Sequence, residues 1–316
     1  MTHFNRRGFI KSASVAATAA VLASRPASGQ RPPPDIGDLR PERDIVFGRG
    51  GDMDLTLDVY HPPENVEPKR MAIIHLFGGG FFVGNKSAGY IINDAKALGR
   101  LGYTNISANY RLQSEGLWPA QIHDTKAAIR WTRANAERLG IDADRIAVAG
   151  YSAGGMLSLM AGATNGMEAF EGNGGNAGVS SDVQAAIGVY PLAAAQTARG
   201  LFSDELSEAA LADAMAAASP TSYIGAGFAP TIFIHGTNDN TVPVSSSIDF
   251  FNRLHDLDVP SALTLIQGAD HAFDNGATDA IEVMAQSIDL FLDRLFVNPQ
   301  PYPSFGAGRR RGPAPG

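Results

Sequence analysis

Cysteine is absent from the 316 residues of this chain. Without thiols the protein can form no disulfide, carries no cysteine nucleophile and holds no zinc through cysteine. The absence says nothing about the compartment, because a disulfide-free protein can fold in an oxidising or a reducing one.

Positive charge is also scarce. The sequence has 25 Lys and Arg against 32 Asp and Glu, a formal net charge of −7. No basic surface is implied, so nucleic acid is not an expected partner. With 44% hydrophobic and 18% charged residues, a chain of this length can bury one large core.

No apolar run near the N-terminus is long enough for a stable membrane span. The first residues contain Asn5-Arg6-Arg7-Gly8-Phe9-Ile10-Lys11, which resembles a bacterial twin-arginine export motif. An Ala-rich stretch follows, and Ala27-Ser28-Gly29 offers small residues for cleavage before Gln30. We expect residues 1–29 to be a twin-arginine signal peptide and the mature protein to be periplasmic or extracellular, without stable membrane insertion. The alternative is a disordered basic N-terminus.

Two further segments have little apolar content. Residues 30–41 carry four prolines, which indicates a linker. Residues 298–316 hold five prolines, four glycines and the run Arg309-Arg310-Arg311, which predicts a disordered tail. These arginines could contact an anionic surface, but a solubilising role is the simpler interpretation. The folded domain is therefore expected over residues 42–297.

Within that domain, short apolar runs alternate with longer segments of helical spacing. Such alternation predicts an α/β fold, with a mainly parallel sheet covered by helices on both faces. The expected strands are 44–47, 55–60, 71–77, 105–109, 145–149, 184–190, 231–235 and 262–266. The expected helices are 119–139, 153–163, 201–218, 246–257 and 278–296.

The strongest chemical signal is Gly150-Tyr151-Ser152-Ala153-Gly154. It follows an apolar strand and leads directly into a helix. A G-x-S-x-G turn at such a corner exposes the serine as a nucleophile, since glycine avoids the clash that a Cβ would cause. The start of the helix would stabilise developing negative charge there.

A serine nucleophile needs a base, and three histidines follow Ser152. His255 lies in a predicted amphipathic helix, where a solvated histidine is the ordinary interpretation. His235 ends a buried strand and favours a structural role. His271 lies in a loop between the last strand and the last helix, the place for a base projecting over the sheet edge. We therefore expect His271 to be the base.

The base needs an orienting carboxylate, and Asp239 is the acidic residue in the loop after the strand that ends at His235. Asp270 is the rival, but its position next to His271 makes an in-line approach to the imidazole Nδ1 difficult. Asp124 precedes the serine and is expected on a helix surface. We therefore favour Asp239.

The oxyanion of the reaction needs backbone N–H donors. Ala153 supplies one, and the glycine run in Phe77-Gly78-Gly79-Gly80-Phe81 can supply others because glycine permits close approach to a substrate. A glycine-rich loop could instead hold phosphate. No Gly-Lys-Ser/Thr follows and no G-x-G-x-x-G opens a helix, so nucleotide binding is a minor alternative.

With these motifs, residues 42–296 resemble the hormone-sensitive-lipase-like esterases and the related feruloyl and acetyl-xylan esterases. The resemblance implies an α/β-hydrolase fold of eight strands with a small cap, and no metal or organic cofactor. It implies that Ser152 is the nucleophile, Asp239 the orienting residue and His271 the base, with oxyanion donors at Gly79, Gly80 and Ala153. The matching pieces are Leu57-Asp58-Val59-Tyr60, Gly78-Gly79-Gly80-Phe81, Asn109-Tyr110-Arg111-Leu112, Trp118-Pro119-Ala120-Gln121, Gly150–Gly155, Ala218-Ser219-Pro220-Thr221, and His235-Gly236 through Val242-Pro243.

One position departs from the family pattern. The family usually has histidine before the three glycines, where this chain has Phe77. His75 lies two residues earlier and is expected on the same side of the strand. Packing must then hold the loop, with a contribution from His75.

Taken together, these features predict a serine carboxylesterase that forms an acyl-enzyme on a small-molecule or oligosaccharide ester. Family analogy indicates acylated plant polysaccharide fragments. The best candidate for a lid is 192–230, but its expected helix is acidic, and 166–181 is expected to be a rim loop. Such a small cover favours short or aromatic acyl groups. The alternatives are an amidase or exopeptidase on the same triad, and a catalytically silent ligand-binding homologue.

Overall fold

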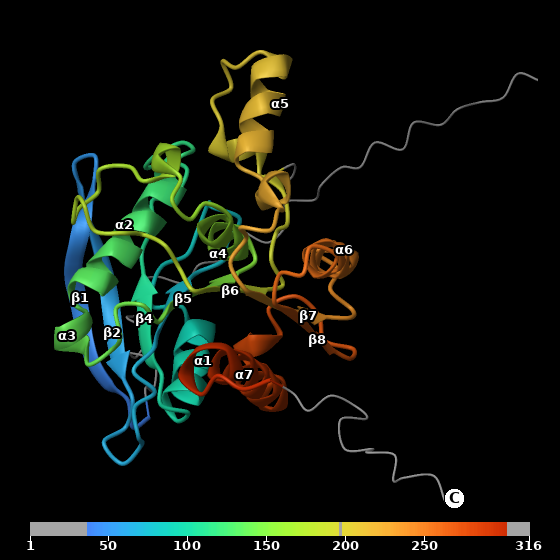
Figure 1. The fold of residues 1–316 in the computed structure, drawn as a ribbon. Helices are drawn as coiled ribbons and strands as arrows, with labels where there is room; N and C mark the ends of the chain where they lie inside the picture. The colour runs from blue at the N-terminus through green and yellow to red at the C-terminus, as the bar shows by residue number, and fades with distance from the viewer. Residues whose placement is uncertain (1–36, 196–197, 302–316) are drawn as a thin grey trace, which may run out of the picture. The chain divides into compact units, whose positions relative to one another are not determined.

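A computed structural model describes residues 37–195 and 198–301, which form an eight-stranded sheet with helices against it (Figure 1). The strand order is β1-β2-β4-β3-β5-β6-β7-β8. The two pairs β1–β2 and β2–β4 are antiparallel, and every other neighbouring pair is parallel. The strands are β1 (Arg40–Gly50), β2 (Met53–His61), β3 (Ala72–Leu76), β4 (Thr104–Ala108), β5 (Ile146–Tyr151), β6 (Ala185–Val189), β7 (Thr231–Gly236) and β8 (Ser261–Ile266).

Helices cover both faces of this sheet (Figure 1). On one face α1 contacts α7, and on the other α2 contacts α4. Phe250 of α6 packs in one apolar cluster with Leu159 of α4 and Phe233 of β7, so α6 shares the face of α4. The α-helices are α1 (Gly89–Gly99), α2 (Ala120–Ala134), α3 (Ala136–Leu139), α4 (Ala153–Ala163), α5 (Glu208–Ala217), α6 (Ser245–His255) and α7 (Thr278–Leu292).

The central strands are hydrophobic because both of their faces are covered. Every residue of β3, β4, β5 and β6 is buried. Continuous apolar runs are what parallel strands between two helical layers require. This explains why the pattern predicted all eight strands close to their observed positions, and the eight-stranded α/β-hydrolase architecture is confirmed.

The helices differ from expectation in several places. Helix α1 was not predicted, although Ile91, Ala95 and Leu98 bury one of its faces at helical spacing. Glycine stands at both of its ends and no side chain caps its N-terminus, so the usual boundary signals are weak. Ser207 caps α5, which confines the expected 201–218 helix to ten residues.

Two other expected helices end or break early. The 119–139 segment is interrupted at Asn135, between α2 and α3. The 278–296 segment is helical to Leu292 and continues as a π-helical turn, η6 (Asp293–Val297).

The folded domain begins before the expected boundary at residue 42. Strand β1 begins at Arg40 and Leu39 is buried, so the end of the expected linker belongs to the domain. The expected signal peptide lies outside the described residues, as does the expected tail beyond residue 301. Within the described part of the chain, no helix combines the length and apolarity needed to cross a membrane.

Candidate active site

Ser152 occupies the corner between β5 and α4, with a left-handed φ of +53°. The glycines around it are needed for space. A Cβ on Gly150 would lie 2.0 Å from the carbonyl oxygen of Gly154, and one on Gly154 would lie 2.1 Å from that of Leu76. The backbone strain at Ser152 is of the kind found at functional sites.

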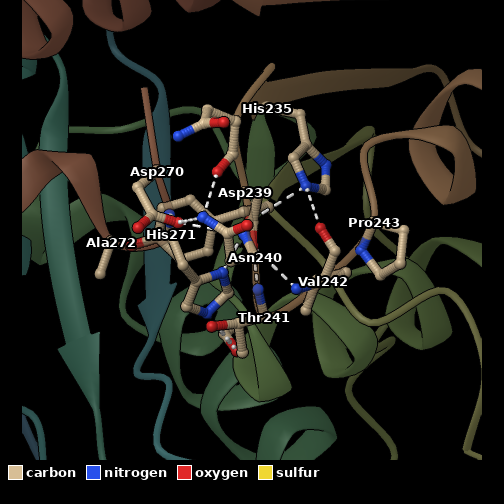
Figure 2. A network of polar contacts seen from close by, with 12 residues as sticks. His235, Asp239, Asn240, Thr241, Val242, Pro243, Asp270, His271 and Ala272 are labelled. Atoms are coloured by element: carbon tan, nitrogen blue, oxygen red, sulfur yellow. Dashed lines mark hydrogen bonds and ion pairs between the residues drawn. The ribbon is translucent and has the colours of Figure 1, made fainter. Parts of the chain in front are cut away.

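His271 bridges Ser152 and Asp239. Its Nε2 lies 3.0 Å from the Oγ of Ser152. Its Nδ1 lies 2.7 Å from an Oδ of Asp239 (Figure 2). The carboxylate can only accept, so Nδ1 donates to Asp239, and the serine hydroxyl donates to Nε2. The three residues named from the sequence are therefore within hydrogen-bond distance in the order Ser, His, Asp.

The Asp239 carboxylate is buried and surrounded by donors (Figure 2). One oxygen accepts from the backbone N–H groups of Thr241 and Val242, both at 2.8 Å. The other accepts from His271 and lies 3.2 Å from Nε2 of His235. These contacts stabilise the ionised carboxylate in the orientation that faces His271.

His235 has the structural role expected from the sequence. Its Nε2–H donates to the carbonyl oxygen of Val242 at 3.0 Å, and its Nδ1 accepts from the hydroxyl of Ser247 at 2.8 Å. Burial lowers the pKa of His235, so its ring is neutral near pH 7. His255 is exposed and stacks on Phe251, as expected for a helical surface residue.

The rival carboxylates are placed differently. Asp270 is exposed, and its Oδ1 accepts from the backbone N–H groups of Asn240 and His271. The N–H of Asn240 is the main cause of its lowered pKa. Asp124 was expected on a surface, and this is wrong. It is buried in α2, where its two oxygens accept from Arg111 at 2.8 and 2.7 Å.

The glycine loop after β3 faces Ser152. Gly79 and Gly80 have positive φ angles of 122° and 64°, and a Cβ on Gly79 would lie 2.0 Å from the carbonyl oxygen of Val83. The N–H of Gly78 donates to the hydroxyl of Tyr90 at 2.8 Å. The N–H groups of Gly79, Gly80 and Ala153 donate to no other residue that the structure describes. They are therefore available to a ligand at Ser152.

Packing holds this loop at Phe77. The Phe77 ring is buried and stacks on Tyr110, with centroids 4.1 Å apart and planes 8° apart. The Tyr110 hydroxyl donates to the carbonyl oxygen of Phe77 at 2.7 Å. His75 lies deeper, where its Nδ1 accepts from Tyr151 and its Nε2 donates to Asn105, both at 2.9 Å. Burial lowers the pKa of His75 to about 4, so its ring is neutral and supports Tyr151, the residue before Ser152, through a hydrogen bond.

A cavity of about 580 Å³ opens above Ser152. Its walls are mostly apolar and aromatic, which suits the acyl or alcohol part of an ester. Among the described residues of 192–230, Leu192 alone lines it, and α5 contributes none. A hollow of about 600 Å³ lies over the 166–182 loop, away from the triad. The lining residues of the first cavity are Gly78, Gly79, Gly80, Val83, Gly84, Ala88, Tyr90, Tyr151, Ser152, Tyr190, Leu192, Thr241, Val242, His271 and Ala272.

Two tyrosines of this cavity were not singled out from the sequence. Tyr90 comes from α1, and Tyr190 directly follows β6. No motif marks either residue. For Tyr190, its place at the carboxyl end of a central parallel strand is a signal, because ligands bind at that edge of such sheets. Among the described residues, no cluster of three or more His, Asp or Glu side chains has an arrangement suited to a metal ion.

Comparison with known proteins identifies the family. The BD-FAE family model matches residues 57–254, which is more than half of the chain. The chain belongs to the BD-FAE family. Among curated relatives, this BD-FAE protein is 30% identical over 284 residues to the esterase LipC of Mycobacterium tuberculosis, covering 84% of this chain and 69% of LipC. It is 29% identical to LipQ of the same organism, covering 80% of this chain and 62% of LipQ.

Solved structures give the same relationship. Esterase Est2 of Thermogutta terrifontis is 28% identical, with a TM-score of 0.69 and coverage of 84% of this chain and 95% of Est2. A truncated carbohydrate esterase from gut microbiota is 25% identical, with a TM-score of 0.67 and coverage of 81% and 100%. The BD-FAE protein is thus an α/β-hydrolase of the carboxylesterase type.

Proposed function

We propose that this chain is a serine carboxylesterase that uses Ser152, His271 and Asp239 as a catalytic triad. The observation that carries the proposal is the continuous chain of hydrogen bonds from Ser152 through His271 to Asp239. Acyl transfer in an α/β-hydrolase requires a serine nucleophile on a strained strand-to-helix corner, a histidine base that contacts it and a carboxylate that orients the base.

The mechanism follows from the geometry. The Oγ of Ser152 attacks the ester carbonyl carbon while Nε2 of His271 takes its proton, and Asp239 stabilises the resulting imidazolium. The N–H groups of Gly79, Gly80 and Ala153 stabilise the oxyanion. His271 then gives the proton to the departing alcohol, and the acyl group remains on Ser152. A water activated by His271 releases the acid and restores the enzyme.

We further propose that the acyl group is short or aromatic and that the alcohol is a small molecule or a plant polysaccharide fragment. The open cavity and the absence of α5 from its lining support a short acyl group. Est2 has been solved with propionate and with butyrate bound, and another similar structure is a carbohydrate esterase.

A fluorophosphonate probe tests the nucleophile directly. We expect it to label wild-type protein on Ser152 and to leave Ser152→Ala unlabelled, and we expect the wild type to hydrolyse p-nitrophenyl acetate. A folded wild type that is neither labelled nor active would support the silent ligand-binding homologue instead.

Amide hydrolysis is a second candidate. The chain is 34% identical over 103 residues, 32% of its length, to the arylacetamide deacetylase of Oryctolagus cuniculus. Comparing kcat/KM on an acetyl ester and on the matching acetanilide separates the two. Faster anilide turnover would favour the amidase.

We also propose that the protein is exported by a twin-arginine signal in residues 1–29 and acts in the periplasm or outside the cell. The proposal rests on the Arg6-Arg7 motif, the Ala-rich stretch behind it and the small residues before Gln30.

A further inference from the structure

The imidazole of His271 has a neighbour on its face as well as hydrogen bonds at its edge. The ring of Tyr190 lies 4.6 Å from the ring of His271, centroid to centroid, at an interplanar angle of 58°. Tyr190 is 2% exposed and lines the cavity above Ser152. It therefore limits how far the imidazole can rotate away from Ser152.

Tyr190 is itself held on two sides. Its backbone N–H donates to the carbonyl oxygen of Ile234 at 2.8 Å, and its φ is +37°, a strained value for a residue other than glycine. Its hydroxyl lies 2.7 and 2.8 Å from the two carboxyl oxygens of Asp274. Strain of this kind persists only where surrounding contacts hold it, and it concentrates at functional sites.

Asp274 connects this contact to the loop that carries the base. It lies three residues after His271 in the short helix η5 (Phe273–Asn275), and its side chain is completely buried. Burial raises the pKa of the Tyr190 hydroxyl, so the phenol keeps its proton and donates to Asp274. Two contacts therefore hold the base in place. Asp239 binds the edge of the imidazole, and Tyr190 packs behind the ring and binds Asp274 of the same loop.

We propose that Tyr190 and Asp274 are positioning residues that hold the imidazole of His271 in its catalytic orientation. The pair forms a clamp in which the phenol ring packs on the imidazole and the phenol hydroxyl binds the same loop three residues on. The inference rests on the proposed function, since it assigns these residues a role in the orientation of the base.

Asp94 of α1 completes the cluster. It is fully buried beside Asp274. By geometry neither of its oxygens makes a hydrogen bond among the described residues, because the nearby Tyr151 hydroxyl donates to His75 instead. Burial, and then the charge of Asp274, raise the pKa of Asp94 well above its usual range. Burial therefore favours the neutral form of Asp94, and the carboxyl oxygens of Asp274 receive the Tyr190 hydrogen bond.

The chain offers a matched control for the clamp. Tyr103 is also fully buried, and its hydroxyl donates to the carboxylate of Asp289 at 2.9 Å. It does not line the active-site cavity. Tyr103→Phe therefore removes the same kind of buried hydrogen bond without touching His271.

The experiment measures kcat, KM and Tm for wild type, Tyr190→Phe, Asp274→Asn, Asp274→Leu and Tyr103→Phe on one p-nitrophenyl ester. For Tyr190→Phe we expect kcat to fall by roughly tenfold to 100-fold, with KM within about twofold, because misplacement of a base affects the chemical step. Asp274→Asn keeps an acceptor for the phenol and should retain more activity than Asp274→Leu. Tyr103→Phe should lower Tm but leave kcat unchanged.

Two outcomes would overturn the clamp. One is a Tyr190→Phe enzyme whose kcat matches that of Tyr103→Phe at a similar Tm. The other is equal activity in Asp274→Asn and Asp274→Leu when both are folded. Wild type and Ser152→Ala are assayed alongside, so that a failure of the proposed esterase function can be told from a failure of the clamp. An inactive wild type contradicts the proposed function, whereas an active wild type with an unaffected Tyr190→Phe contradicts the clamp alone.

Discussion

The Nε2 atom of His271 lies 3.0 Å from the Oγ atom of Ser152, although 119 residues separate the two in the sequence. Strand order explains the proximity, because Ser152 follows β5 and His271 follows β8 at the same edge of a parallel sheet.

Substitution of the nucleophile or the base should abolish catalysis without unfolding the protein. We expect Ser152→Ala and His271→Ala each to lower kcat by about 10⁴ or more, and Asp239→Asn to cost a similar or somewhat smaller factor. Steady-state kinetics on p-nitrophenyl acetate, with circular dichroism as a check of folding, measures this.

Asp270→Asn is the matched control for the carboxylate. Asp270 accepts from the backbone N–H groups of Asn240 and His271 but contacts no imidazole nitrogen. Inactivation by Asp270→Asn together with normal activity of Asp239→Asn would reverse the assignment.

Phe77→His should be tolerated. The imidazole can retain part of the stacking on Tyr110, and the Tyr110 hydrogen bond goes to the backbone, which the substitution leaves in place. We expect activity within roughly tenfold of wild type, about 1.4 kcal/mol of barrier. A loss close to that of Ser152→Ala would show a role for Phe77 beyond packing.

The acyl preference follows from the size and openness of the cavity. Each buried methylene contributes about 0.8 kcal/mol, so a cavity that is filled by a few carbons gains nothing from longer chains. We expect kcat/KM on p-nitrophenyl esters to be highest from acetyl to butyryl and to fall sharply by octanoyl. A maximum at decanoyl or longer would mean that residues 192–230 form an apolar cover in solution.

The buried carboxyl pair makes stability depend on pH. Burial raises the pKa of Asp274 to about 6 and raises that of Asp94 well above its ordinary value. Between the ordinary carboxyl pKa near 4 and these raised values, the folded protein holds more protons than the unfolded chain. The free energy of unfolding therefore falls as pH rises through this window.

Asp94→Asn removes the contribution of Asp94 to this pH dependence. We expect it to raise Tm relative to wild type by at least about 3 °C at pH 8, and by much less at pH 4, where both carboxyls are neutral in the folded state. Calorimetry from pH 4 to 8 measures the difference. A gain in Tm that is the same at every pH would contradict the assigned pKa directions.

Export can be tested with residues 1–30 fused to a reporter that folds in the cytoplasm. We expect the fusion to cross a bacterial inner membrane and the Arg6→Lys, Arg7→Lys double variant to remain inside. Export that is indifferent to this double change would remove the twin-arginine interpretation.

Local features of the site could be predicted from the sequence because their causes are local. Gly150 and Gly154 flank the serine at positions where any side chain would clash with the backbone. The buried strands appear in the sequence as apolar runs. The candidates Asp239 and His271 were found by their places after strands, since the carboxyl ends of parallel strands share one edge.

The environment of those residues depended on contacts that only the folded chain makes. Asp124 was expected on a surface, yet Arg111 pairs with it in the interior. Tyr190 and Asp274 are 84 residues apart and carry no motif, so their contact has no trace in the sequence. Composition and spacing report which side chains can be buried or reactive. Which of them meet is decided by the order of the strands and by the packing of α1 and η5 beneath the triad.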